Sequence, residues 1–119
     1  MKKFIWRHGP TIFMAVLIFV LSSIPKLTIP DIGLNFKDTF YHFIEFGIFG
    51  FFLQRSFNSI KTQKPNRFFI VFILGSLYAV LDEFHQSFVP GRISSLSDII
   101  ADCLGLLCAQ VIFLWVRKK

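Results

Sequence analysis

Acidic, histidine and amide side chains recur at helical spacing in three separate stretches of this sequence. Within each stretch the polar residues are three or four positions apart, so a helix would present them on one face. The three sets are Asp38 with His42 and Glu45, Asp82 with His85 and Gln86, and Asp98 with Asp102. Polar faces of this kind predict a site that is built from several helices.

Carboxylates and histidines that converge in this way are suited to proton transfer and ligand binding. Closely spaced carboxylates disfavour one another's ionisation, so one of them stays protonated and acts as a general acid, with a histidine as base. We expect catalysis, or protonation of a ligand, to depend on Asp82, Glu83 and Asp98. An arginine guanidinium would hold a phosphate or a carboxylate with two hydrogen bonds. The expected ligand-binding residues are Asp38, His42, Glu45, His85, Gln86, Arg92 and Asp102.

The pattern does not identify a reaction. The sequence contains no P-loop, nucleophile elbow or zincin motif, so whether the protein is an enzyme stays open. Pairs such as His42 with Glu45 and Asp82 with His85 resemble carboxylate and histidine metal ligands in helical bundles. Short acid–histidine spacings are nevertheless common, and we predict neither a metal nor any other cofactor from the sequence.

The elements that must position these residues are long apolar segments. The 119 residues are 54% hydrophobic and have a mean hydropathy of +0.61. Such values indicate a membrane protein and not a soluble bundle. Four apolar runs, separated by Pro, Gly and charged residues, predict helices at about residues 5–25, 36–54, 68–88 and 96–116. We therefore predict an all-α fold, a four-helix transmembrane bundle that forms a single domain over residues 1–119.

The charge distribution predicts the orientation of this bundle. Most of the thirteen Lys and Arg residues precede the first apolar run, separate the second from the third, or follow the fourth. The positive-inside rule places these regions in the cytoplasm, together with both termini, and predicts a multi-pass protein of the cell membrane. The basic residues form no helix face of their own, which argues against nucleic acid as a partner.

The length of the third run determines how deep its polar residues lie. Phe68 to Leu81 is an uncharged run of fourteen residues, whereas a membrane-spanning helix needs about 20. The helix must therefore continue to about Phe88, and it carries Asp82 and Glu83 into the membrane. The three polar faces then share one depth near the outer surface. Because ionisable groups are costly in lipid, we expect them to turn inward and form an outward-facing polar pocket, with Arg92 at its rim.

A non-enzymatic alternative stays open. Polar contacts between helices can simply hold a membrane bundle together. On this alternative the protein is a membrane scaffold or a small subunit, and its polar stripes bind partner helices. Neutral substitutions in the stripes would then lower the amount of folded protein in step with function. A homo-oligomer is compatible with both hypotheses.

The polar blocks resemble those of the VanZ-like family of small multi-pass bacterial membrane proteins. The likeness extends over about residues 10–116, and its most specific part runs from Asp82 to Asp102. The family often has Asn at the position of Asp102, which leaves the charge there open. The matching blocks are Lys37-Asp38 with His42 and Glu45, Asp82-Glu83 with Gln86-Ser87-Phe88, Pro90-Gly91-Arg92, and Ser97-Asp98 with Asp102 and Gly105.

The resemblance implies a protein of the bacterial cell envelope. The namesake of the family is associated with resistance to the glycopeptide antibiotic teicoplanin, and the family implies no particular reaction. Our leading hypothesis is therefore a protein of the lipid bilayer whose outward pocket binds or modifies an anionic lipid or a lipid-linked cell-wall component. Such a protein would contribute to antibiotic resistance by altering teicoplanin susceptibility.

Overall fold

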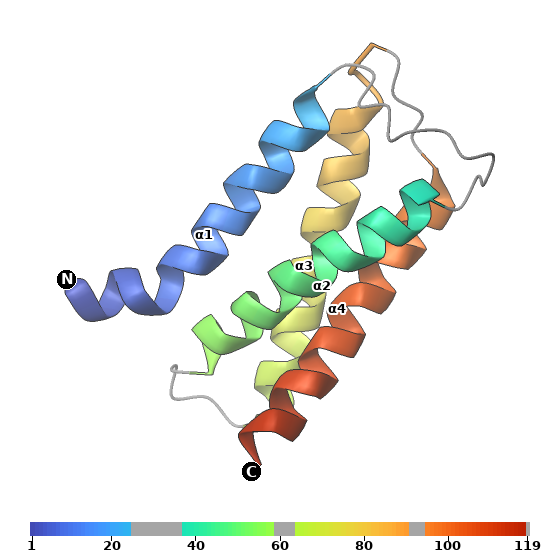
Figure 1. Ribbon diagram of the computed structural model, residues 1–119. Coiled ribbons are helices and arrows are strands. Elements are labelled where there is room, and N and C mark those ends of the chain that lie inside the picture. Colours follow the sequence, from blue (N-terminus) through green and yellow to red (C-terminus); the bar gives the residue numbers. More distant parts are fainter. Residues whose placement is uncertain (25–36, 59–63, 91–94, 119) are drawn as a thin grey trace.

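A computed structural model of the protein describes residues 1–24, 37–58, 64–90 and 95–118, without the side chains of residues 37, 38, 64 and 65. Within these ranges the chain forms four α-helices (Figure 1). The helices are α1 (Lys2–Ser23), α2 (Lys37–Phe57), α3 (Lys64–Gln86) and α4 (Leu96–Arg117). No strand occurs in these ranges. The all-α fold predicted from the sequence is confirmed. The third helix ends at Gln86 and is followed by a turn, so it includes the polar residues that follow the apolar run.

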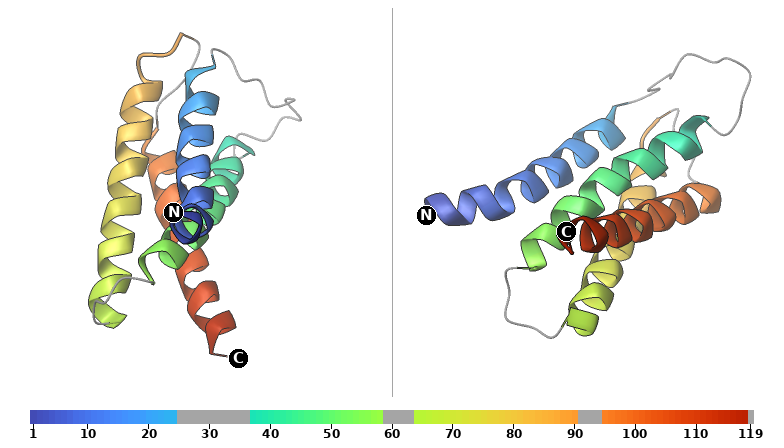
Figure 2. Two further views of the ribbon diagram at one scale, coloured as in Figure 1. Left: turned by 90° about the vertical axis from the view of Figure 1, so that its left-hand side faces the viewer. Right: turned by 60° about the horizontal axis from the view of Figure 1, so that its bottom comes forward.

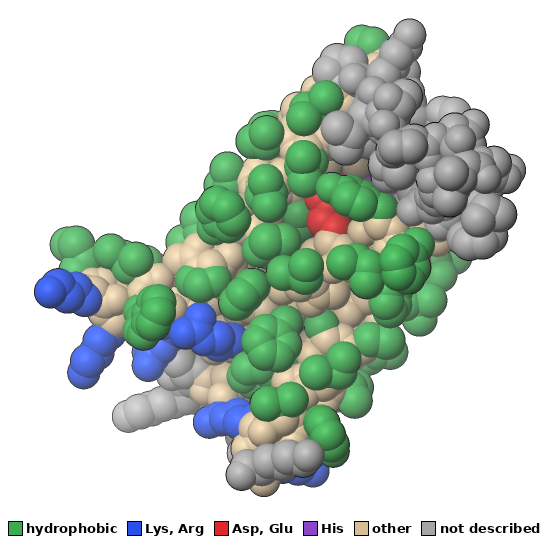
Figure 3. Space-filling view, viewed as in Figure 1, with side chains coloured by type: hydrophobic (Ala, Val, Ile, Leu, Met, Phe, Trp, Pro, Cys, Tyr) green, Lys and Arg blue, Asp and Glu red, His purple; other side chains and the backbone are tan. Residues whose placement is uncertain are grey.

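The surface of the protein is apolar, whereas much of its interior is polar. Large hydrophobic side chains such as Trp6 and Phe84 are 77% and 63% exposed, and side chains of this type cover the helices in the space-filling view (Figure 3). Among the described residues, buried polar and charged side chains are at least as numerous as buried hydrophobic ones. In a soluble protein, polar and charged side chains are the ones that are buried least. The distribution is that of a protein surrounded by lipid.

Three of the helices are long and apolar enough to cross a membrane. They cover Lys2–Ser23, Asn66–Gln86 and Leu96–Arg117. The fourth helix, α2, is equally long, but it carries His42 and Glu45 near its start and Gln54 with Arg55 near its end. These residues lower its hydropathy. By length and composition, the described chain therefore contains three candidate spans and one helix of intermediate polarity.

The most extensive contact between helices joins α2 and α4, which run side by side in the same direction (Figures 1 and 2). Glycines bring the two backbones close together. A Cβ atom added at Gly105 would lie 2.3 Å from the carbonyl oxygen of Phe43, and one added at Gly50 would lie 3.1 Å from the Cα atom of Leu106. Small residues permit such close approach between membrane helices. This contact sets the distance between the polar faces of α2 and α4.

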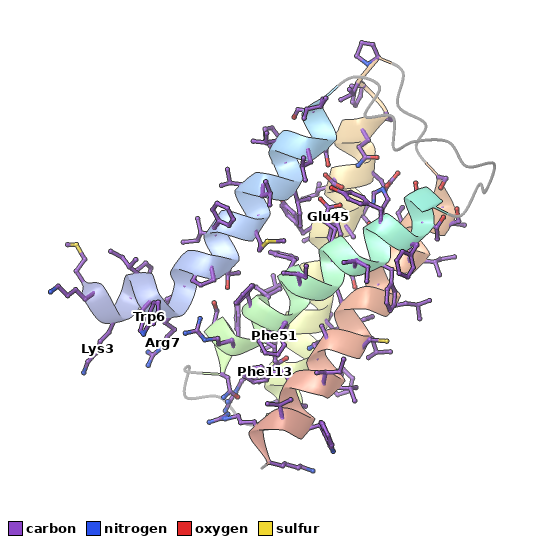
Figure 4. All side chains as sticks on the ribbon, in the orientation of Figure 1. Lys3, Trp6, Arg7, Glu45, Phe51 and Phe113 are labelled. Atoms are coloured by element: carbon purple, nitrogen blue, oxygen red, sulfur yellow. The ribbon has the colours of Figure 1, made fainter. Side chains whose placement is uncertain are left out.

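Helix α1 packs against α2 and α3 and is bent near its start (Figure 1). Pro10 lies inside this helix. A proline removes a backbone hydrogen bond and clashes with the preceding turn, which explains the bend. The segment before the bend projects from the bundle and carries Lys3, Trp6 and Arg7 (Figure 4). Beyond the bend, Ile18 is fully buried in the apolar core beside Phe46 and Val71.

Neutral polar contacts join the helices at the end where α2 ends and α3 begins. The side-chain amide of Gln110 donates to Gln54 Oε1 at 2.8 Å and to the Phe68 carbonyl at 2.9 Å. The hydroxyl of Thr11 donates to the Phe52 carbonyl at 2.8 Å. Described Lys and Arg side chains also gather at this end (Figure 3). At the same end the guanidinium of Arg67, on α3, donates to the backbone carbonyl and to Oδ1 of Asn58, after α2, at 3.0 and 2.7 Å.

Candidate functional site

Four ionisable side chains from three helices meet at the opposite end of the bundle. His42 of α2 lies 3.0 Å from Asp102 of α4, measured from Nδ1 to Oδ1. Its other ring nitrogen, Nε2, lies 3.8 Å from both Glu83 Oε1 of α3 and Asp98 Oδ2 of α4. We call His42, Glu83, Asp98 and Asp102 the acid–histidine cluster. All four residues are buried, with exposed fractions of 4%, 2%, 7% and 0%.

Neighbouring groups orient the carboxylates of this cluster. The second oxygen of Glu83, Oε2, accepts a hydrogen bond from the backbone N–H of Ser95 at 3.2 Å. The second oxygen of Asp98, Oδ1, accepts one from the Thr39 hydroxyl at 3.4 Å. Ser95 is also the N-cap of α4, because its hydroxyl accepts from the Asp98 N–H. The start of α4 thus holds the carboxylate of Glu83, on α3, and the start of α2 holds that of Asp98, on α4.

Asp82 belongs to a separate group that joins α3 to α1. Its carboxylate accepts a short hydrogen bond from the Ser22 hydroxyl and a longer one, at 3.2 Å, from the amide of Gln86. The same amide donates to the Ser22 oxygen at 3.2 Å. All three residues are buried. Ser22, Asp82 and Gln86 form what we call the serine–aspartate group, in which the carboxylate is well supplied with donors.

His85 faces α1 and not the acid–histidine cluster. Its ring stacks on Phe19 with a centroid distance of 4.7 Å, and its Nε2 lies 2.8 Å from the Ser23 hydroxyl. Glu45 is buried on α2, one turn after His42, and lies near the gap between α1 and α2 (Figure 4). An acidic patch is visible between these two helices (Figure 3).

The structure thus divides the residues that the sequence marked as a site. It brings four of them into the acid–histidine cluster and places Asp82 with Gln86 in the neighbouring serine–aspartate group. Arg92 and the side chain of Asp38 lie outside the described residues, so their place at the site stays a prediction. The sequence analysis missed Ser22 and Thr39, which bond to the acidic residues. Ser22 lies near the end of α1 and Thr39 near the start of α2. Both positions are at the end of the bundle that carries the acids, and this was the signal available in the sequence.

The cluster has two chemical capacities. An imidazole between carboxylates can hold a proton or pass it on, and the same arrangement can hold a cation. Asp102 adds a third carboxyl group, whose Oδ2 is buried without a hydrogen-bond partner among the described residues. Buried charge of this kind is costly in a membrane and marks a functional site by default. The fold and the site together define a helical membrane protein with a buried acid–histidine centre.

A comparison with protein families identifies the group to which this membrane protein belongs. The VanZ/LLP1 family matches residues 10–117, which is nearly the whole chain. The chain belongs to the VanZ/LLP1 family, and the resemblance inferred from its polar blocks is confirmed. Searches of curated proteins and of solved structures gave no match.

Proposed function

We propose that this VanZ-type membrane protein spans the cell membrane four times, has both termini in the cytoplasm, and acts in the bacterial cell envelope. Its acid–histidine cluster faces outward, where it binds the headgroup of an anionic lipid or of a lipid-linked cell-wall component. By occupying or altering that component, the protein lowers teicoplanin susceptibility. Arg92 and Asp38 complete the site at its outer rim.

One observation supports this proposal above the others. Ionisable side chains of α2, α3 and α4 converge at the end of the bundle opposite the basic residues (Figure 3). The positive-inside rule assigns the basic end to the cytoplasm, so the acidic end faces outward. A site at this depth would lie level with lipid headgroups and with a cell-wall precursor that is attached to a lipid.

The opposite end of the same bundle argues against adhesion as the only role of the cluster. There, the amides of Gln54 and Gln110 and the hydroxyl of Thr11 join the helices through neutral hydrogen bonds. Such bonds contribute about 0.6 kcal/mol each on average in a membrane, without the cost of burying charge. No described Asp or Glu side chain lies at that end, where the one described charged contact is that of Arg67 with Asn58. Three buried carboxylates are therefore more than contact between helices requires, and a ligand explains them better.

The proposed orientation can be tested by labelling single cysteines. The two native cysteines are free and would be replaced in Cys103→Ser, Cys108→Ala. In this background we expect Ser87→Cys, after α3, to react with a membrane-impermeant maleimide in intact cells. Asn58→Cys, after α2, should react only after the membrane is permeabilised. The reverse pattern of labelling would place the acidic end in the cytoplasm and contradict the proposal.

The proposed role can be tested by teicoplanin susceptibility in a Gram-positive host that the antibiotic kills. We expect wild type to raise the inhibitory concentration, and Asp98→Asn and Arg92→Gln to abolish this protection at an unchanged amount of membrane protein. Cys108→Ala is the matched control, since it changes an exposed residue of α4 away from the cluster. It should protect as wild type does.

The scaffold alternative makes a different prediction in the same assay. If the polar residues only join helices, protection should fall in proportion to the amount of folded protein, or survive Asp98→Asn altogether. Either result would remove the support for an outward ligand site. A wild type without any protective effect would show that teicoplanin is not the relevant antibiotic for this member of the family.

A further inference from the structure

The acid–histidine cluster has the composition and geometry of a metal site. We propose that His42, Glu83 and Asp98 bind a divalent transition cation, with Zn²⁺ and Mn²⁺ as the ions that suit one imidazole and two carboxylates. Their ligand atoms all lie within 4.8 Å of one another. One ligand comes from each of α2, α3 and α4, so a bound ion would join three helices at a single point.

The distances leave room for an ion between the ligands. His42 Nε2 lies 3.8 Å from Glu83 Oε1 and from Asp98 Oδ2, which is beyond hydrogen-bond range. Bonds from zinc to nitrogen or oxygen are about 2.0–2.2 Å long, so neighbouring ligand atoms on one ion lie about 3.0–3.5 Å apart. Small side-chain rotations would therefore bring these three atoms around one cation.

Each proposed ligand is also held by an outer partner, as metal ligands usually are. In the metal-bound state Asp102 would be an ionised carboxylate, which only accepts hydrogen bonds, so His42 Nδ1 would donate to it and Nε2 would offer its lone pair to the ion. The Ser95 N–H and the Thr39 hydroxyl occupy the outer oxygens of Glu83 and Asp98. The other oxygens, Glu83 Oε1 and Asp98 Oδ2, are the ones that lie 3.8 Å from Nε2.

A second observation, separate from the three ligands, also indicates a cation. Asp102 is 0% exposed, and its Oδ2 atom has no hydrogen-bond partner among the described residues. Negative charge at such an atom is unfavourable in a low-dielectric interior. A cation on the far side of the imidazole would offset it, as in the carboxylate–histidine–zinc arrangement.

The cation would also explain how an acidic site accepts an anionic ligand. Three carboxylates alone would repel a phosphate or a carboxylate headgroup, whereas a bound divalent ion would attract it and coordinate one of its oxygens. This consequence depends on the proposed function. The metal site itself depends only on the geometry of His42, Glu83, Asp98 and Asp102.

The test is a metal-binding titration of the full-length protein, purified in detergent and stripped with a chelator. After titration with Zn²⁺ or Mn²⁺ and removal of free ions, we expect elemental mass spectrometry to find one bound ion per chain. Glu83→Gln and Asp98→Asn should weaken binding by about 100-fold or more, and Asp102→Asn by about 10–100-fold, the usual cost of losing an outer partner. Asp82→Asn makes the same change at the carboxylate next to Glu83 and should bind as wild type does.

Two results would overturn the inference. Wild type without saturable binding of either ion would leave the cluster to be neutralised by protons or by Arg92. Equal losses in Asp82→Asn and Glu83→Gln would show unspecific attraction to acidic residues. The wild-type stoichiometry is decisive even where a variant fails to fold, which circular dichroism would reveal. Because the titration uses neither lipid nor antibiotic, it can fail or succeed independently of the susceptibility assay.

Discussion

Substitution of Gly105 by alanine should disrupt the bundle, although alanine is the better helix former. The new Cβ atom would lie 2.3 Å from the Phe43 carbonyl oxygen and 3.0 Å from the Gly47 backbone nitrogen. Both are backbone atoms, so the helices α2 and α4 must separate. Inserting a carbon into a packed interface costs about 1–3 kcal/mol, and we expect a value at the upper end because no side chain can rotate away.

The matched control lies on the other side of the same contact. A Cβ atom added at Gly47 would lie 3.7 Å from the Gly105 carbonyl oxygen, an ordinary van der Waals distance. Gly47→Ala should therefore be neutral, or more stable by up to about 1 kcal/mol through helix propensity. Thermal unfolding in detergent would compare the two variants. Equal melting temperatures for Gly105→Ala and Gly47→Ala would show that α2 and α4 do not pack as closely as described.

Replacement of His42 by leucine is the second change with a large expected effect. It would leave Glu83, Asp98 and Asp102 buried without the imidazole that lies between them. Removing one partner of a buried ionic group costs about 3–5 kcal/mol, because the remaining charge stays uncompensated. We expect a lower melting temperature and less folded protein in the membrane than for wild type, measured in the presence of a chelator so that bound metal does not contribute.

His85→Leu is the control for this experiment. The His85 ring contacts Phe19 and Ser23 outside the cluster, so its loss removes one hydrogen bond, worth about 0.5–1.5 kcal/mol. The double variant His42→Leu, Asp102→Asn should recover part of the lost stability, since it also removes one of the stranded charges. If His42→Leu were no more damaging than His85→Leu, the carboxylates of the cluster could not be ionised around the imidazole.

The sequence predicted the helices and the end of the bundle at which the polar residues meet. Apolar runs bounded by Pro, Gly and charged residues indicated the helices, and the all-α fold is confirmed. The convergence of Asp98 and Asp102 with His42 followed from their spacing and from a shared membrane depth. These features depend on periodicity and length, which a single sequence contains.

The rotation of each helix about its own axis could not be predicted. Spacing grouped Asp82 with His85 and Gln86, but adjacent helical residues point about 100° apart. In the structure Asp82 faces α1, whereas Glu83 faces α2 and α4. The choice between these two orientations depends on packing partners from distant parts of the chain. The close contact at Gly105 is of the same kind, since it depends on how two separate backbones meet.

The intermediate polarity of α2 has a consequence for biosynthesis on the proposed four-span topology. Until α3 and α4 are in place, His42 lacks its partners Glu83, Asp98 and Asp102, and the main packing surface of α2 belongs to α4. During translation α2 emerges long before α4, and polar residues that lower the hydropathy of a helix disfavour its release from the translocon. The ribosome must therefore finish most of the chain before α2 can settle in the bilayer, so a nascent chain that stops before α4 should be a substrate for membrane proteases.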